Sequence, residues 1–520
     1  WIRMLSRSYG TKLLIALFLI QHATKGFAMS WIVTTLNFYF RDVGGITSSE
    51  IQTYTAVIMT PWCLKGILGL LSDTVTIHGY HKGPWITMTT IVAVLASLKI
   101  GLTPLSAISK LTAISSLLLV QFHIAFSDLL TEAKYSERIR QFPKYGSDLI
   151  SYVWGGMSFA QLLAVATIGV LIESYGSRHV FAISAIPLAL GFFPGSWNLL
   201  EETKELPSNP PEAGRCFLPF GILGFDSHKL KKHIGYLILV LILTAMSLLL
   251  AVMGVVSTNT KLNCVVALGA FCVTLGSFFA CADLMVAKTN AYFLLCACCY
   301  ISIEGATFYF FTDSPIQYPE GPHFSTTFYT TGIGLVASGT SMLGIYMYNQ
   351  LFSTKKYRVI FLLNGSLWAT INIISCAVFL RWNLRVGIPD EFFVLGSQAL
   401  QQMVLQLGWI PGVVLMSHLC HDGMEATMYA IMAGSQNLGS NISYFTGAYL
   451  LEALEVQPSG AKGESDQFEH LWLVAILSSA AGLFPLLFLP FLIPDARPDE
   501  KLVDRRGTSM DQTTRATTSS

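Results

Sequence analysis

Two side chains of opposite charge interrupt long apolar runs of this sequence. Lys25 follows Gln21 by four residues, which places both on one face of a helix. Glu304 has a similar context in the second half, because it also precedes a glycine and an aromatic run. We expect Lys25 and Glu304 to line one polar cavity and to pair when it is empty. A fixed structural ion pair is the alternative.

Lys65 is a second cation within an apolar run, and it lies three residues after Trp62. It is expected either to bind an anionic group or to extend its amine to the polar surface. Flat ring systems bind against aromatic side chains. Trp62 and Phe308 are candidates for that contact, although aromatic residues in apolar segments commonly serve packing alone.

Five acidic residues lie at the ends of apolar runs, and they are Asp73, Asp128, Glu132, Asp422 and Glu425. Charges at such positions can pair with basic residues of neighbouring helices and close a gate. The alternative is that one of them carries a proton.

His123 and two asparagines are further polar residues inside apolar runs. Imidazole titrates near neutrality, so His123 is a candidate for proton coupling, whereas simple hydrogen bonding is the alternative. Asn437 and Asn441 are expected to hydrogen-bond a heterocycle or to join neighbouring helices.

Signatures of enzymes and nucleotide-driven pumps are missing from the sequence. It has no phosphate-binding loop, no His-Glu-x-x-His and no Gly-x-Ser-x-Gly. The ten cysteines lack paired metal-ligand spacing. We therefore expect no enzymatic activity, no cofactor and no metal site.

Composition identifies the class of protein. Hydrophobic residues make up 52% of the chain and charged residues 12%, against about 25% charged residues in soluble domains. The net charge of +1 gives no reason to expect a nucleic-acid partner. We expect an all-α polytopic protein whose surroundings are the lipid bilayer.

A bilayer is crossed by about 20 apolar residues in a helix, and about fourteen segments meet that length. They are residues 12–40, 50–72, 85–103, 108–131, 147–174, 178–198, 233–256, 263–287, 289–312, 325–351, 357–380, 395–420, 424–453 and 470–494.

The distribution of Lys and Arg predicts orientation, because basic loops stay in the cytoplasm. Most basic residues lie on the side of the N-terminus, so both termini are expected in the cytoplasm. The expected parts are an N-terminal six-helix bundle (1–198), a cytoplasmic connector (199–232), an extra hairpin (233–288), a C-terminal six-helix bundle (289–494) and a disordered cytoplasmic tail (495–520).

A weak internal repeat supports this division. The residues from Asp128 to Tyr135, DLLTEAKY, are echoed by the residues from Asp422 to Tyr429, DGMEATMY. Repeated halves in a membrane chain are typical of transporters whose site lies near the bilayer midplane. We therefore expect the major facilitator fold, with two six-helix bundles, an additional two-helix hairpin and about 14 transmembrane helices.

Several separated motifs occur in the order seen in one known family. They are Pro61-Trp62, Lys65-Gly66, Leu71-Ser72-Asp73, Gly79-Tyr80, the 128–137 segment, Pro143 to Asp148, Val153-Trp154-Gly155 and Gly423 to Thr427. The sequence resembles the folate–biopterin transporter family over about residues 15–495, and the extra helix pair resembles its kinetoplastid and protist branch.

The resemblance implies a plasma-membrane importer of folate or unconjugated pterins such as biopterin, with protons as the coupling ion; we expect a monomer. The anionic tail of folate would suit Lys25 and Lys65, and its ring would suit aromatic and amide side chains. Two alternatives remain open. One is transport of another small metabolite such as S-adenosylmethionine, and the other is a sensor or scaffold that no longer transports.

Overall fold

A computed structural model describes residues 1–204, 215–217, 223–226, 234–420, 425–498 and 500. Most of the predicted connector and tail therefore lies outside the described residues, including Lys229, Lys231 and Lys232. Contacts divide the chain into two compact units. Unit 1 is Trp1–Val43 with Leu64–Leu241, and unit 2 is Gly44–Cys63 with Ile242–Ser520.

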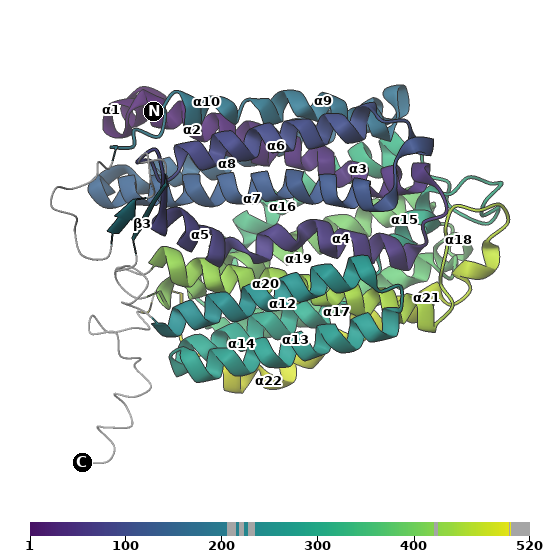
Figure 1. The fold of residues 1–520 in the computed structure, drawn as a ribbon. Coiled ribbons are helices and arrows are strands. Elements are labelled where there is room, and N and C mark those ends of the chain that lie inside the picture. Colours follow the sequence, from purple (N-terminus) through teal and green to yellow (C-terminus); the bar gives the residue numbers. More distant parts are fainter. Residues whose placement is uncertain (205–214, 218–222, 227–233, 421–424, 499, 501–520) are drawn as a thin grey trace, which may run out of the picture. The chain divides into compact units, whose positions relative to one another are not determined.

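Unit 1 is built from helices with one small sheet (Figure 1). Its helices are α1 (Ile2–Tyr9), α2 (Thr11–Leu17), η1 (Phe18–Ala28), α3 (Met29–Val43), α5 (Lys65–Thr74), α6 (Gly83–Leu102), η2 (Leu105–Ala107), α7 (Lys110–Gln141), η3 (Pro143–Tyr145), α8 (Gly146–Tyr175), α9 (Ser177–Ala189) and α10 (Phe192–Ser196). Helices α2, η1 and α3 follow one another without a break and form one apolar rod, Thr11–Val43.

Small residues bring helices of unit 1 close together. A Cβ on Gly101 of α6 would overlap the backbone of Ala182 in α9. A Cβ on Gly195 of α10 would overlap the carbonyl of Gly83 in α6. Glycine permits this approach because it has no side chain, and membrane helices use it for dispersion contacts.

The sheet of unit 1 was not predicted from the sequence. Its strands are β1 (Val75–Ile77), β2 (Arg215–Phe217) and β3 (Leu223–Asp226), in the antiparallel order β1-β3-β2. Val75 is registered with Phe225, and Arg215 with Asp226. The segment after α5 therefore pairs its backbone with part of the predicted connector.

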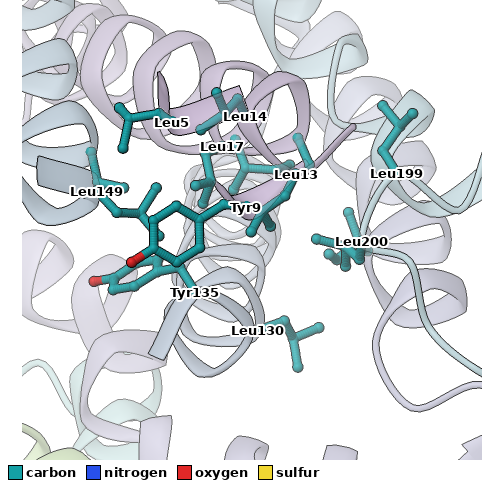
Figure 2. Packing of buried hydrophobic residues seen from close by; sticks show 14 of the residues in the cluster. Leu5, Tyr9, Leu13, Leu14, Leu17, Leu130, Tyr135, Leu149, Leu199 and Leu200 are labelled. Atoms are coloured by element: carbon teal, nitrogen blue, oxygen red, sulfur yellow. The ribbon is translucent and has the colours of Figure 1, made fainter. Parts of the chain in front are cut away.

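A hydrophobic cluster joins the first two helices to the rest of unit 1 (Figure 2). Leu5 and Tyr9 of α1 are almost fully buried there beside Leu13 and Leu17 of α2. Residues of α7, of α8 and of the segment after α10 complete it, namely Leu130, Tyr135, Leu149, Leu199 and Leu200. Burying such side chains contributes about 1.5–3 kcal/mol each, so this cluster holds α1 in place.

Unit 2 contains one early helix, α4 (Ser48–Cys63), and most of the second half of the chain. The other helices are α12 (Ile234–Val256, from Ile242 onward in this unit), α13 (Thr260–Cys281), α14 (Leu284–Cys299), α15 (Glu304–Thr312), η5 (Phe328–Gly332), α16 (Ile333–Met347), η6 (Tyr348–Phe352), α17 (Tyr357–Ser375), η7 (Cys376–Val378), α18 (Trp382–Arg385), α19 (Asp390–His418), α20 (Glu425–Ala453), η8 (Ser465–Phe468), α21 (Leu471–Ala481) and α22 (Phe484–Leu492).

Helix α4 packs against α20. The backbone N–H of Ser48 donates to the carbonyl of Pro458 at 2.9 Å, just beyond α20. The hydroxyl of Ser49 donates to the carbonyl of Ala448 at 2.9 Å. The sequence places α4 in the N-terminal bundle (1–198), whereas its contacts group it with unit 2. The bundle boundaries stay a prediction.

The expected all-α polytopic membrane fold is confirmed. Among the described residues, helices occupy all fourteen predicted segments, and 12 of them are long and apolar enough to cross a membrane. Within their described residues, two predicted segments do not meet this criterion of length and hydropathy. They are 325–351, which contains η5, α16 and η6, and 424–453, which contains α20.

Candidate functional site

A π-helix in the first membrane segment carries two of the predicted site residues. Helix η1 contains Gln21 and Lys25, and it lies between two α-helices of the same rod. A π-helix is rare, its i→i+5 hydrogen bonds depart from the α-helical pattern, and it is frequently found at functional sites. No residue type in the sequence signals it.

Glycines of α8 and η1 allow these two helices to meet closely. A Cβ on Gly26 would lie 2.7 Å from the carbonyl oxygen of Met157. A Cβ on Gly156 would overlap the imidazole of His22, and His22 Nε2 lies 3.0 Å from the carbonyl of Tyr152. This contact fixes the direction in which η1 presents Lys25.

Asp128 of α7 is the centre of the polar site in unit 1. Its side chain is fully buried, and both carboxylate oxygens accept charged hydrogen bonds. Lys25 Nζ lies 2.9 Å from Oδ1, and Lys65 Nζ lies 2.7 Å from Oδ2. Gln21 donates a third bond to Oδ1 at 2.9 Å. A buried charge is tolerated when it is paired and hydrogen-bonded in this way.

Glu132 and Thr131 extend the site along α7. Glu132 lies one helical turn beyond Asp128, and its Oε2 is 3.4 Å from Lys65 Nζ. The Gln21 amide also donates to the Thr131 hydroxyl at 2.7 Å. Two lysines and two carboxylates balance one another, so the formal charge of the site is zero. We define this set, Gln21, Lys25, Lys65, Asp128, Thr131 and Glu132, as the lysine–carboxylate site.

Trp154 is a partly exposed aromatic neighbour of the lysine–carboxylate site. Lys25 Nζ lies 5.4 Å from the ring centre of Trp154 in α8, a distance that allows a cation–π contact. Trp154 remains 39% exposed, and the Lys25 side chain is 16% exposed. The amine therefore contacts both a buried carboxylate and the face of a partly open ring.

His123 is buried one helical turn before Ser127 on α7. Its Nδ1 lies 3.1 Å from the hydroxyls of both Thr89 and Ser127. Its Nε2 has no hydrogen-bond partner among the described residues. These contacts suit a structural histidine, and its role in proton coupling stays a prediction.

Helix α4 ends where α5 begins, and the predicted asparagines meet it there. Pro61 lies inside α4, and Leu64 leaves helical geometry before Lys65 starts α5. Asn437 donates to the carbonyl of Trp62 at 3.0 Å, and Asn441 Nδ2 lies 3.4 Å from Cys63 Sγ. Both amides thus join α20 to α4, which is one of the two roles expected of them.

Glu304 lies at a break in its membrane segment, not inside a continuous helix as the sequence suggested. Helix α14 ends at Cys299, and α15 begins at Glu304. The exposed carboxylate of Glu304 accepts a hydrogen bond from the Tyr444 hydroxyl. Phe308 is fully buried beside Tyr309 and Tyr329, so it offers no open ring face.

Gln52 is a residue at this break that the sequence reasoning missed. It belongs to α4, it is 1% exposed, and neither polar atom of its amide has a partner among the described residues. It packs against Gly305 of α15 and Gly447 of α20. A polar residue amid the apolar run of α4 was the available signal.

The remaining predicted residues lie apart from the lysine–carboxylate site or outside the description. Asp73 is exposed near the end of α5. Asp422 lies outside the described residues. Glu425 begins α20, but its side chain is not described. Pairing of Lys25 with Glu304 involves one residue of each unit and stays a prediction.

Comparisons with known proteins agree on one family. The profile of the BT1 family matches residues 25–514. A protein of Arabidopsis thaliana named probable folate-biopterin transporter 6 is 24% identical over 503 residues, covering 97% of this chain and 87% of the relative. The folate-biopterin transporter of Synechocystis sp. is 25% identical over 468 residues, with coverage of 90% and 79%.

Part of the chain also resembles a protist protein. Folate transporter 2 of Plasmodium falciparum is 27% identical over 202 residues, covering 36% of this chain and 42% of the relative. Matches to protist relatives over part of the chain do not assign it to the kinetoplastid and protist branch.

Solved structures share the fold at low identity. A POT family transporter in complex with 5-aminolevulinic acid superposes with a TM-score of 0.64 at 14% identity, covering 92% of this chain and 96% of that chain. A D-xylose-proton symporter gives a TM-score of 0.57 at 12% identity, covering 94% and 98%. The predicted major facilitator fold is thereby confirmed.

Proposed function

Because the chain belongs to the BT1 family, we propose that it is a secondary transporter that imports folate or unconjugated pterins by alternating access, coupled to protons. One observation carries the proposal. A single buried carboxylate, Asp128, binds two lysines that reach it from two other segments, Lys25 from η1 and Lys65 from α5. The names of the relatives motivate the substrate class.

The two lysines bind the anionic end of the substrate. A folate carboxylate has the same chemistry as Asp128, so it competes for the same amines. Lys25 is the first point of contact, because its side chain is 16% exposed while that of Lys65 is 10% exposed. An incoming carboxylate therefore displaces Asp128 from Lys25 before it reaches Lys65.

A proton makes that displacement favourable. An ionised Asp128 holds both lysines, whereas a protonated Asp128 loses the charge that attracts them. When the substrate carboxylate takes the amines on the acidic side of the membrane, Asp128 is left buried without its counter-charges and accepts a proton. Loss of the proton on the other side restores the Lys25–Asp128 and Lys65–Asp128 pairs and expels the anion. Proton and substrate then move in the same direction.

Trp154 provides the surface for the flat ring. Its ring is partly open and lies beside Lys25, so a pterin could stack on it while its anionic tail meets the amine. Phe308 was the aromatic candidate of the second half, and its full burial disfavours such a role. Trp62 remains a candidate for the ring contact.

The other parts of the proposal follow the sequence. Both termini face the cytoplasm, and the protein works in the plasma membrane as a monomer. The two six-helix bundles open the substrate site first to one side of the membrane and then to the other. Asp73, Asp422 and Glu425 act as gate charges in this scheme.

Uptake by cells that express the full chain tests the proposal. Labelled folate and labelled biopterin are offered with and without an inward proton gradient. We expect uptake above vector control for at least one of them, with stimulation by the gradient. Asp128→Asn should remove the stimulation, and Asp466→Asn, which changes an exposed acid of η8, should keep it. Absence of uptake, or full stimulation in Asp128→Asn, would refute the proposal.

A further inference from the structure

A cavity of about 450 Å³ lies in unit 1 between α1, the start of the first membrane rod and α8. Its polar wall includes Arg3, Ser6, Arg7 and Thr11, and its apolar wall includes Ile15 and Phe18. It is separate from the lysine–carboxylate site, none of whose residues lines it. Nothing in the proposed transport cycle uses this cavity.

The polar wall of the cavity carries two positive charges, those of Arg3 and Arg7. Arg3 and Arg7 are four residues apart on α1, so their guanidinium groups extend from one face of that helix. Both are exposed, and among the described residues neither forms an ion pair with a carboxylate. The hydroxyls of Ser6 and Thr11 lie 2.5 Å apart beside them. No acidic residue described in the structure lines the cavity.

Helix α1 is packed against other helices of unit 1, and this packing holds Arg3 and Arg7 at the cavity. Leu5 is fully buried and Tyr9 is 2% exposed in the hydrophobic cluster of Figure 2. The Tyr9 hydroxyl donates to the carbonyl of Phe142 at 2.6 Å, beyond the end of α7. Helix α1 is thus amphipathic, with one face in the protein and a basic face outward, as in helices that lie at a membrane interface.

The apolar wall belongs to the surface that faces lipid. Ile15 is 44% and Phe18 is 52% exposed, and both lie in the rod Thr11–Val43 that crosses the membrane. Acyl chains cover such side chains in a bilayer. The cavity therefore joins an anion-binding end to a hydrocarbon-binding end, and this combination fits an amphiphile better than a free ion.

We propose that this cavity binds an anionic phospholipid, with its phosphate between Arg3 and Arg7 and an acyl chain along Ile15 and Phe18. Guanidinium groups suit phosphate oxygens because their N–H donors form a planar fork. Basic pockets at the ends of membrane helices bind acidic headgroups in the same way. Inorganic phosphate shares the headgroup chemistry but has nothing to contact the apolar wall.

Lipid binding to the purified, delipidated full chain tests this proposal. Native mass spectrometry would measure binding of phosphatidylglycerol, phosphatidylcholine and inorganic phosphate. We expect phosphatidylglycerol to bind most tightly, and excess inorganic phosphate to leave it bound. The double change Arg3→Gln and Arg7→Gln should weaken its binding roughly thirtyfold, from the typical contribution of two basic residues near anionic lipid.

A matched control removes the same charge elsewhere. Lys12 and Lys144 are exposed and do not line the cavity, so the double change Lys12→Gln and Lys144→Gln should retain lipid binding. Phe18→Gln should weaken binding of the long-chain lipid with the arginines intact. Equal binding of the two phospholipids, equal loss in both double variants, or complete displacement by inorganic phosphate would each overturn the proposal.

Discussion

The pairing of Lys65 with Asp128 makes a quantitative prediction for the free energy of unfolding. The two charges are 2.7 Å apart, and the side chains are 10% and 0% exposed. Coulomb attraction at this distance is about 6 kcal/mol with an effective dielectric constant near 20, before the cost of desolvation is subtracted. Removing one partner of a buried pair typically costs about 3–5 kcal/mol, because the other charge stays buried without compensation.

A double-mutant cycle isolates this interaction. Lys65→Met should destabilise the protein by about 3 kcal/mol, since Lys25 and Gln21 still bind Asp128. Asp128→Asn should destabilise it by about 4 kcal/mol, since two lysines lose their common partner. The double variant should lose at least about 2 kcal/mol less than the sum of the single losses. Reversible unfolding in mixed detergent micelles would measure each value.

The chain offers a control pair at nearly the same distance. Lys356 and Asp495 are 2.8 Å apart, but their side chains are 47% and 49% exposed. Solvent screens such a pair, so the cycle of Lys356→Met with Asp495→Asn should give a coupling energy below about 1 kcal/mol. Additive losses at Lys65 and Asp128, or equal coupling in the two pairs, would show that Asp128 is not the charged centre of its site.

Three further changes test packing and hydrogen bonding. Gly156→Ala should destabilise the protein by about 1–3 kcal/mol, because the new Cβ would overlap His22. Gly155→Ala is the control, because its Cβ would meet nothing within 4 Å, and it should be neutral or stabilising in thermal unfolding. Equal effects of the two changes would contradict the close contact of η1 with α8. Asn437→Ala should cost about 0.6–1.7 kcal/mol by loss of its bond to α4, and an unchanged unfolding free energy would contradict that bond. Gln52→Leu should keep or raise stability by about 1 kcal/mol, because it removes a buried amide that has no hydrogen-bond partner among the described residues. A clear loss of stability in the same unfolding assay would contradict this description of Gln52.

The sequence predicted the membrane segments and named most residues of the lysine–carboxylate site, but it did not pair them. Apolar length decides where a helix crosses a bilayer, so all fourteen predicted segments contain helices in the described parts. Lys25 and Lys65 were identified because a charge in an apolar run needs a partner. Gln21 was identified because it shares a helix face with Lys25, and Asp128 and Glu132 because they are acids at the end of an apolar run.

Partners could not be assigned because they come from segments far apart in the chain. Lys25 and Asp128 are 103 residues apart, and Lys65 and Asp128 are 63 apart. Charge alone made Glu304 an equally suitable partner for Lys25. Only the packing of η1, α5 and α7 brings two lysines to one carboxylate.

Departures from regular helix were also outside the reach of the sequence reasoning. A π-helix differs from an α-helix in bonding i→i+5 in place of i→i+4, and the 11 residues of η1 are too few for the apolar pattern to separate the two. The break from Tyr300 to Ile303 falls inside an apolar segment that reads as continuous in the sequence, and backbones of other segments pack closely beside it. Gly305 and Gly447 let α15 and α20 approach the carbonyls of Ser48 and Ser302.

Selectivity between folate and biopterin tests the central claim most directly. Only folate carries the carboxylates that Lys25 is proposed to bind. We predict that Lys25→Gln lowers uptake of labelled folate about tenfold or more, the equivalent of about 1.4 kcal/mol, and leaves biopterin uptake nearly unchanged. Lys25→Arg, which keeps the charge, and Lys99→Gln, which changes an exposed lysine of α6, serve as controls at equal surface expression. An equal loss of both substrates, or normal folate uptake by Lys25→Gln, would contradict the claim.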